Sequence, residues 1–255
     1  MIRDVQFNSA TTPWPEMRDA VLAAEAAGYG IAWTLDHIAG QMMGGDSMLE
    51  CCTLTGALAA TTSSIGIGTL VANVWNRPCG VLAAAAATMQ NISGGRFWLG
   101  IGAGASPKSP YAAEHAALGI EIDPDITVRH ARVTEFLALA RRMWSTGEID
   151  GVVGFPQPIA PIPLMFGVNS VSLARMAGVE ADAINVRSNH VRLEEIIDAA
   201  REARPAGAPP LIVTTWARTT PELRDPSSAA SHFFEKIGID RLILVQVDRA
   251  DVTQL

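Results

Sequence analysis

The chain has 255 residues, of which 49% are hydrophobic and 18% are charged, and its formal net charge at pH 7 is −7. This length is close to that of a (β/α)8 barrel built as one domain. The negative charge and the lack of a basic stripe argue against a nucleic-acid-binding protein. No apolar run approaches the roughly 20 residues of a membrane-spanning helix. The composition therefore indicates a globular protein with neither nucleic acid nor membrane as a partner.

The three cysteines are Cys51, Cys52 and Cys79, and no CxxC pair is present. Adjacent cysteines do not form an ordinary disulfide, so we interpret these residues as buried apolar side chains in a reducing compartment. A redox or metal-binding role is the alternative, although no metal site is predicted. The N-terminal residues lack the apolar segment of a signal peptide, and a cytoplasmic location is expected.

The first part of the chain alternates β-type runs with helical segments. We expect a strand at Val5–Asn8, a helix at Met17–Ala27, a strand at Ile31–Thr34, a loop at Ala39–Asp46 and a helix at Leu49–Thr61. Gly28, directly after the first helix, is a typical C-terminal signal. The second strand leads into Asp36 and His37, at the end of a strand where barrel enzymes place catalytic residues.

The stretch from Ile65 to Gly104 predicts a strand, a crossover helix and a second strand. The strands are expected at Ile65–Val71 and Phe97–Ile101, with the helix at Val81–Gln90 between them. Such a unit closes as a parallel pair, and parallel strands bind ligands at their carboxyl ends. Asn73 and Gly104 are therefore predicted to meet at the functional surface.

The remaining chain continues the alternation. We expect a helix at Thr127–Trp144, a loop at Gly151–Pro163, a strand at Pro163–Gly167, a helix at Ser170–Ala177 ended by Gly178, a strand at Asp182–Val186, a helix at Val191–Ala203, a strand at Leu211–Thr215, a helix at Ser228–Ile237 and a strand at Arg241–Val247. Eight strands alternating with helices predict a single TIM-barrel domain over residues 1–255, with the last helix short or missing. An open doubly wound sheet is the alternative.

Two motifs at strand ends suggest a site. The run from Gly100 to Gly104 lacks the third glycine of a dinucleotide fingerprint, since Ala105 and then Pro107 follow. It is better interpreted as a loop that offers backbone N–H groups to a phosphate or carboxylate, or as a tight strand exit without a ligand. In the Asp36-His37 pair, histidine can transfer a proton near neutral pH and a carboxylate can hold its tautomer. A structural loop histidine is the alternative.

The chain resembles the luciferase-like flavin- and deazaflavin-dependent oxidoreductases. The matching segments are AEAAGYGIAWTLDH ending at His37, LAATTSSIGIGTLV ending at Val71, NRP at Asn76–Pro78, ISGGRFWLGIGAG ending at Gly104, RHARVTEFLALARRMW, and PLMFGVNS at Pro163–Ser170. They follow the family's order over most of residues 20–190. The resemblance implies a TIM barrel that binds FMN or coenzyme F420 at its carboxyl end.

The resemblance also implies roles for individual residues. Asp36 and His37 correspond to the pair beside the reacting ring carbon and are the expected catalytic residues. Leu70 and Val71 correspond to a cis peptide whose bulge backs the ring. The other expected cofactor-binding residues are Asn73, the phosphate-side loop of Gly102, Ala103 and Gly104, and a second phosphate loop of Gly167, Val168, Asn169 and Ser170 at a helix N-terminus.

Other candidates are less specific. Candidates to pair a phosphate or the acidic tail of coenzyme F420, or else to be solvated surface charges, are Arg77, Lys108, Arg175 and Arg187. Candidates to line the pocket, or else to pack at its rim, are Asn8, Asn73, Asn185, Trp33, Trp75 and Trp216. Two departures leave the substrate open: the segment between Gly147 and Pro163 is abbreviated, and Ala105 stands where the sugar-phosphate dehydrogenase branch has a glutamate.

The resulting hypothesis is an oxidoreductase that transfers a hydride between coenzyme F420 and a small organic substrate, expected as a cytoplasmic homodimer. The preference for coenzyme F420 comes from the Asp36-His37 and GVNS matches. An FMN-dependent monooxygenase or reductase of the same family is the first alternative. A relative that binds a flavin-type ligand without turnover is the second.

Overall fold

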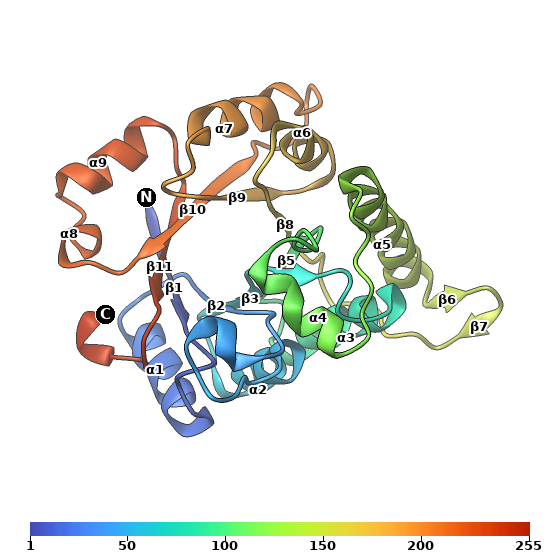
Figure 1. Cartoon of the computed structure of the whole chain (residues 1–255), viewed down its shortest axis with the longest axis horizontal. Coiled ribbons are helices and arrows are strands. Elements are labelled where there is room, and N and C mark those ends of the chain that lie inside the picture. The colour runs from blue at the N-terminus through green and yellow to red at the C-terminus, as the bar shows by residue number, and fades with distance from the viewer.

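A closed barrel of parallel strands forms the centre of the computed structural model, which describes residues 1–255 (Figure 1). Its strands are β1 (Ile2–Phe7), β2 (Ile31–Thr34), β3 (Gly66–Thr69), β5 (Phe97–Gly102), β8 (Leu164–Gly167), β9 (Ala183–Arg187), β10 (Ile212–Arg218) and β11 (Arg241–Gln246). Neighbours follow the order β3-β2-β1-β11-β10-β9-β8-β5, and pairing of β3 with β5 closes the ring. The predicted (β/α)8 barrel is confirmed, because an open sheet would leave β3 and β5 unpaired.

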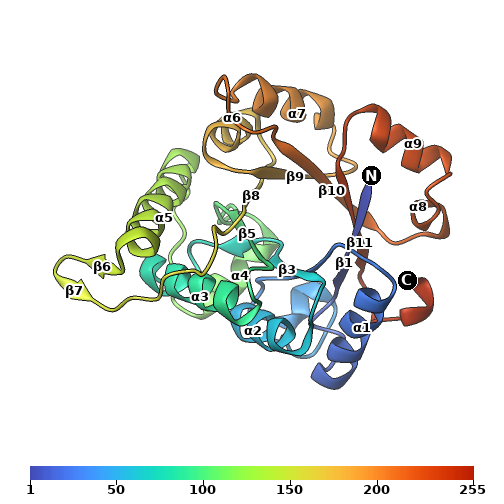
Figure 2. The ribbon, with the colours of Figure 1, turned by 180° about the vertical axis from the view of Figure 1, so that it is seen from behind.

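Helices surround the barrel on its outside (Figures 1 and 2). The main helices are α1 (Trp14–Ala26), α2 (Cys51–Thr61), α3 (Cys79–Ile92), α5 (Ile126–Thr146), α6 (Val171–Glu180), α7 (Leu193–Glu202), α8 (Pro221–Arg224) and α9 (Ala229–Lys236). After β11 the chain continues into a short 3-10 turn at Val252–Gln254. None of the helices has the combination of length and apolar character that crossing a bilayer requires.

The strands are apolar on both faces. Their outward side chains form the larger part of the apolar core, between the barrel and the helices, and their inward side chains form a smaller cluster inside the barrel. In β11, Leu242, Ile243 and Leu244 are consecutive and almost fully buried. Leu242 and Leu244 belong to the large cluster that also includes side chains of α3, α5, α6 and α7. Ile243 faces the other way and packs with Trp33 inside the barrel. Burial on both faces is typical of parallel sheets covered by helices.

Helix α6 extends past the residue expected to end it. The prediction placed its end before Gly178, but the helix continues to Glu180. A side chain at Gly178 would place its Cβ 2.1 Å from the carbonyl oxygen of Ala200 in α7. The glycine therefore allows close packing of two helices and does not end one. Sequence alone cannot separate these two uses.

Short regular elements also occur where the sequence pattern predicted no helix or strand. They are a 3-10 turn at Gly40–Met43, a 3-10 turn at Pro110–Ala112 continued by α4 (Ala113–Ala117), and a hairpin of β6 (Glu148–Ile149) and β7 (Val152–Val153). The hairpin projects from the edge of the molecule (Figures 1 and 2), and Val152 and Val153 are exposed. Elements of two to five residues are too short to produce a hydrophobic period, which is why the sequence pattern did not predict them.

Glu25 of α1 ties this helix to the segment that enters β3. Its Oε1 accepts hydrogen bonds from the backbone N–H groups of Ser63 at 2.8 Å, Ser64 at 2.5 Å and Ile65 at 2.9 Å. Partial burial works against the charge, but these hydrogen bonds outweigh it and lower the pKa of Glu25 to about 2. The lowered pKa means that the ionised form stabilises the fold.

We therefore expect a pH-dependent effect of Glu25→Gln. The unfolded pKa is near 4.5, so the stabilisation by the carboxylate is complete above that pH and is lost as the pH falls towards 2. The difference in unfolding free energy between wild type and variant should be about 1 kcal/mol at pH 6 and should shrink at pH 3. Urea denaturation at both pH values measures it, and an equal difference at both would contradict the assignment.

Candidate active site

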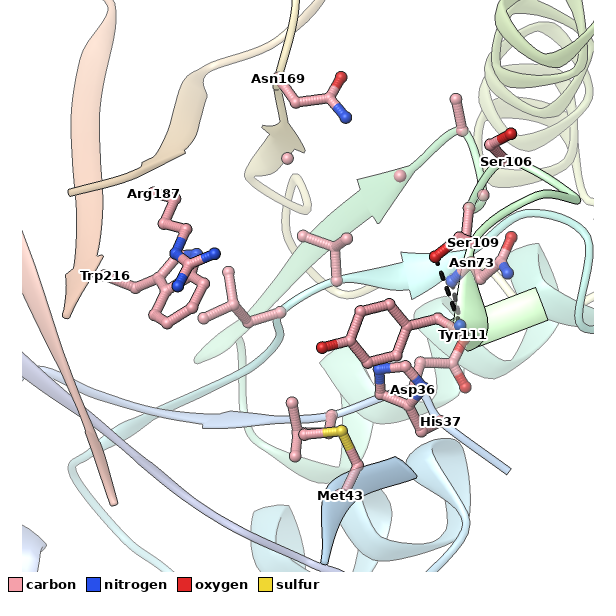
Figure 3. A pocket seen from close by; sticks show the side chains of 18 of the residues that line it. Asp36, His37, Met43, Asn73, Ser106, Ser109, Tyr111, Asn169, Arg187 and Trp216 are labelled. Atoms are coloured by element: carbon pink, nitrogen blue, oxygen red, sulfur yellow. Dashed lines mark hydrogen bonds between the residues drawn. The ribbon is translucent and has the colours of Figure 1, made fainter. Parts of the chain in front are cut away.

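A cavity of about 760 Å³ opens at the carboxyl ends of the strands (Figure 3). All but two of the expected site residues line it. Those that do are Asp36, His37, Leu70, Val71, Asn73, Gly102, Ala103, Gly104, Gly167 and Asn169. The two exceptions, Val168 and Ser170, have structural roles. Val168 is buried in the core, and the Ser170 hydroxyl caps α6 by accepting a hydrogen bond from the N–H of Leu173.

The peptide between Leu70 and Val71 is cis, as predicted. It separates β3 from β4 (Ala72–Asn73), a second short strand that pairs with the end of β5. Glycines flank the Val71 side chain: a Cβ on Gly102 would lie 2.7 Å from one of its methyl carbons, and a Cβ on Gly167 would lie 3.0 Å from the other. The two glycines therefore make room for Val71 in the floor of the cavity.

Asn73 and Gly104 meet at the cavity as predicted. Gly104 has φ +81°, and a Cβ there would lie 3.1 Å from the side-chain oxygen of Asn73 and 2.9 Å from the Trp75 ring. Both the positive φ and the lack of space require glycine at this position.

The Asp36 carboxylate is directed away from His37, contrary to the interpretation that it would hold the histidine tautomer. It accepts hydrogen bonds from the backbone N–H of Asn73 at 2.7 Å and from both terminal nitrogens of Arg77 at 2.9 and 2.8 Å. Arg77 also pairs with Glu50 at 2.6 Å. Burial disfavours the charge on Arg77, but the hydrogen bonds and attraction of Asp36 outweigh it, and the pKa of Arg77 is raised. Both carboxylate oxygens of Asp36 are thus engaged, and Arg77 is not free to hold a phosphate.

The partner of His37 is Glu114, which sequence reasoning did not single out. Its Oε1 lies 2.9 Å from Nδ1 of His37, and its Oε2 accepts hydrogen bonds from the N–H groups of Ile38 and Ala39, both at 2.8 Å. Burial opposes the charge on Glu114, but these contacts lower the pKa of its carboxyl group. The Tyr111 ring lies beside the imidazole, with centroids 5.4 Å apart. These contacts fix the ring and leave Nε2 as the nitrogen available to a ligand.

Buried polar atoms without partners occur on residues that line the cavity. They include Nδ1 of His115, Nε of Arg129 and Nε2 of His130, and all three residues line the cavity. Burial, with a contribution from Arg129, lowers the pKa of His130 and favours its neutral form. Buried polar groups normally have hydrogen-bond partners. Their absence here indicates a place where a polar ligand would bind. The adjacent Arg129-His130 pair at the start of a helix was the available sequence signal.

The other candidates divide between the cavity and the rest of the molecule. Asn8, Arg187 and Trp216 line the cavity, whereas Lys108, Arg175, Asn185 and Trp33 do not. Asn185 donates to the Thr214 hydroxyl inside the barrel, and the Trp33 N–H donates to the Asp4 carboxylate. Trp75 lines a smaller neighbouring cavity.

The cysteines and other metal-ligating side chains form no recognisable centre. No group of three or more His, Cys, Asp or Glu side chains is placed to hold a metal ion. Burial raises the pKa of Cys52 to about 11 and that of Cys51 well above its usual value, which disfavours reactive thiolates.

Comparison with known proteins now identifies the family. A model described as "Luciferase-like monooxygenase" matches residues 3–243. The chain belongs to the luciferase-like monooxygenase family. Relatives include an F420-dependent glucose-6-phosphate dehydrogenase of Beutenbergia cavernae, 32% identical over 62% of this chain and 48% of the relative. A pyrimidine monooxygenase of Bradyrhizobium sp. is 29% identical over 73% of this chain and 57% of the relative. The luciferase-like chain thus spans about half the length of the curated relatives it matches.

Solved structures of low sequence identity share the fold. An F420-dependent secondary alcohol dehydrogenase in complex with an F420-acetone adduct superposes with a TM-score of 0.73 and 17% identity, covering 99% of this chain and 96% of that one. The monooxygenase RslO1 from Streptomyces bottropensis superposes with a TM-score of 0.71 and 17% identity, covering 100% and 95%. These likenesses support the luciferase-like barrel.

Proposed function

We propose that this chain is a coenzyme F420-dependent oxidoreductase that transfers a hydride between the coenzyme and a small organic substrate. The observation that carries the proposal is the single cavity that combines His37, the Leu70–Val71 bulge and both glycine loops. Relatives named as F420-dependent dehydrogenases support it, as does a 5,10-methylenetetrahydromethanopterin reductase of Methanolobus tindarius that is 27% identical over 73% of this chain and 55% of the relative.

The residues of the cavity fit a coenzyme with an extended ring and a phosphate. Its volume of about 760 Å³ lies within the range typical of cofactor sites. The N–H groups of the Gly102–Gly104 loop and the unpartnered nitrogens of Arg129 and His130 would hold the phosphate. Val71 would support one face of the ring. The bound coenzyme would supply the hydride chemistry itself.

His37 would hold or move the proton that accompanies the hydride. Glu114 occupies Nδ1 of its ring, so the proton would move at Nε2 on the cavity side. The contact of Nδ1 with the Glu114 carboxylate fixes the orientation of the ring. Asp36 and Arg77 would act indirectly, because Asp36 holds the backbone of Asn73 at the cavity wall.

A second candidate function is an FMN-dependent monooxygenase or reductase. The similarity to a pyrimidine monooxygenase over 73% of the chain favours it. A third possibility, a relative that binds a flavin-type ligand without turnover, predicts a filled cavity and no reaction.

The proposal is tested by a turnover screen. The chain is incubated with alcohols, ketones and activated alkenes in the presence of oxidised or reduced coenzyme F420, and the visible absorbance of the coenzyme is followed. A parallel screen uses reduced FMN with dioxygen. We expect turnover with coenzyme F420 for at least one substrate class. Turnover with FMN alone would favour the monooxygenase, and coenzyme binding without any turnover would favour the ligand-binding relative.

We also propose that the protein is a homodimer, as the family resemblance suggested. Light scattering of the purified protein measures its mass, which should be twice that of the 27.0 kDa chain. A monomer at all concentrations would contradict this part of the proposal.

A further inference from the structure

Two arginines on one wall of the cavity have no acidic partner. Arg187 is the last residue of β9 and Arg218 is the last residue of β10, and both line the cavity. By contrast, Arg77 pairs with Asp36 and Arg241 pairs with Asp4. The side chains of Arg187 and Arg218 are exposed at the cavity wall, where their guanidinium groups are accessible to a ligand.

Trp216 holds one of these arginines in place. It lies directly opposite Arg187 in the pairing of β9 with β10, and the guanidinium carbon lies 5.2 Å from the centre of the tryptophan ring. Stacking of this kind orients the planar group while its N–H edge stays free. Arg218 is two residues beyond Trp216 on β10 and therefore on the same face of the strand. The two arginines form an adjacent pair on the wall.

The positive charges of Arg187 and Arg218 are not neutralised by a carboxylate that lines the cavity. The carboxylates that line it are Asp36 and Glu114, and both are engaged, the first by Arg77 and the second by His37 and two backbone N–H groups. No carboxylate is therefore left for Arg187 and Arg218. A cleft lined by one sign of charge concentrates ligands of the opposite sign. Guanidinium groups bind carboxylates and phosphates through paired hydrogen bonds.

The arginine wall lies apart from the glycine-loop end of the cavity. In Figure 3, Arg187 and Trp216 lie on the opposite side of the space from Ser106, Ser109 and Asn73. An anion on the wall would thus be distinct from a coenzyme phosphate at the glycine loop.

We propose that Arg187 and Arg218 form a subsite for a carboxylate or phosphate group of the substrate, so that the substrate is an organic anion whose neutral end reacts near His37. This inference rests on the proposed function and adds the chemical class of the substrate. It gives Trp216 the role of a positioning residue for Arg187.

The test compares matched probes that differ only in charge. Isothermal titration calorimetry measures the affinity of the coenzyme-free protein for benzoate and for its neutral isostere benzamide. The variant is Arg187→Gln with Arg218→Gln. The matched control is Arg175→Gln with Lys236→Gln, which removes the same charge from exposed positions outside the cavity.

We expect the wild type to bind benzoate at least tenfold more tightly than benzamide. The double arginine variant should lose this preference, whereas the control variant should keep it. No preference for benzoate in the wild type, or an undiminished preference in the double arginine variant, would overturn the proposal.

A second titration separates this inference from the proposed function. Coenzyme F420 should bind the double arginine variant within threefold of its wild-type affinity. A tenfold loss would show that the arginines hold the acidic tail of the coenzyme and would overturn the substrate subsite, with the proposed function intact. If the wild type prefers benzoate but does not bind coenzyme F420, the proposed function fails and the anion site stands.

Discussion

Replacing His37 by alanine should lower kcat by about 10²–10⁴-fold, the usual contribution of a general acid or base, while the affinity for coenzyme F420 stays nearly unchanged. The reason is that Glu114 holds Nδ1 of the imidazole and leaves Nε2 available in the cavity. Steady-state turnover with a substrate from the screen, together with a coenzyme titration, measures both quantities. Normal turnover would make His37 structural, and loss of the coenzyme would make it a binding residue.

Glu114→Gln is the matched variant that keeps the size of the partner and removes its charge. The amide oxygen can still accept a hydrogen bond, so the fold of the 110–117 segment should persist. Because the imidazole loses its anionic partner at Nδ1, kcat should fall, but less than in His37→Ala. An unchanged kcat would show that Glu114 only anchors the backbone of Ile38 and Ala39.

Replacing Arg77 by methionine should lower the free energy of unfolding by about 3–5 kcal/mol, because it leaves a buried carboxylate without its partner. The Asp36 side chain is only 1% exposed and the Arg77 side chain 14%. Urea denaturation measures the loss. Arg175→Met, at an exposed position outside the cavity, is the control and should change stability by less than about 0.5 kcal/mol.

The double variant Asp36→Asn with Arg77→Met identifies the cause of that loss. Once the carboxylate is neutral, no buried charge is left uncompensated, so part of the stability should return. If Arg77→Met were no more destabilised than the Arg175 control, the Asp36–Arg77 pair would not be important for stability.

The barrel could be predicted from sequence because its signals are local. Runs such as Leu242–Val245 are apolar on both faces, which indicates a strand in a covered parallel sheet, and helices with one apolar face alternate with them. The cis peptide at Leu70–Val71 was predicted from the family match alone. Gly178 was misread because its close approach to Ala200 depends on how two helices pack, and no local pattern reports that distance.

The site was only partly predictable for the same reason. Asp36 and His37 follow a strand directly, and their position at the cavity follows from the fold. Glu114 reaches His37 across 77 positions of sequence, from a five-residue helix without a hydrophobic period. The pairing of Asp36 with Arg77 likewise depends on how the loop after β4 returns. Contacts of this kind are set by the tertiary structure, so the sequence suggested a His–Asp pair where the structure has a His–Glu pair.

The most direct test of the account is an equilibrium titration of the purified chain with coenzyme F420 and with FMN, at low and high salt. We expect coenzyme F420 to bind more tightly than FMN, and its affinity to fall with added salt because its acidic tail and phosphate carry several charges. FMN binding that equals or exceeds that of coenzyme F420 would contradict the assignment and favour the monooxygenase.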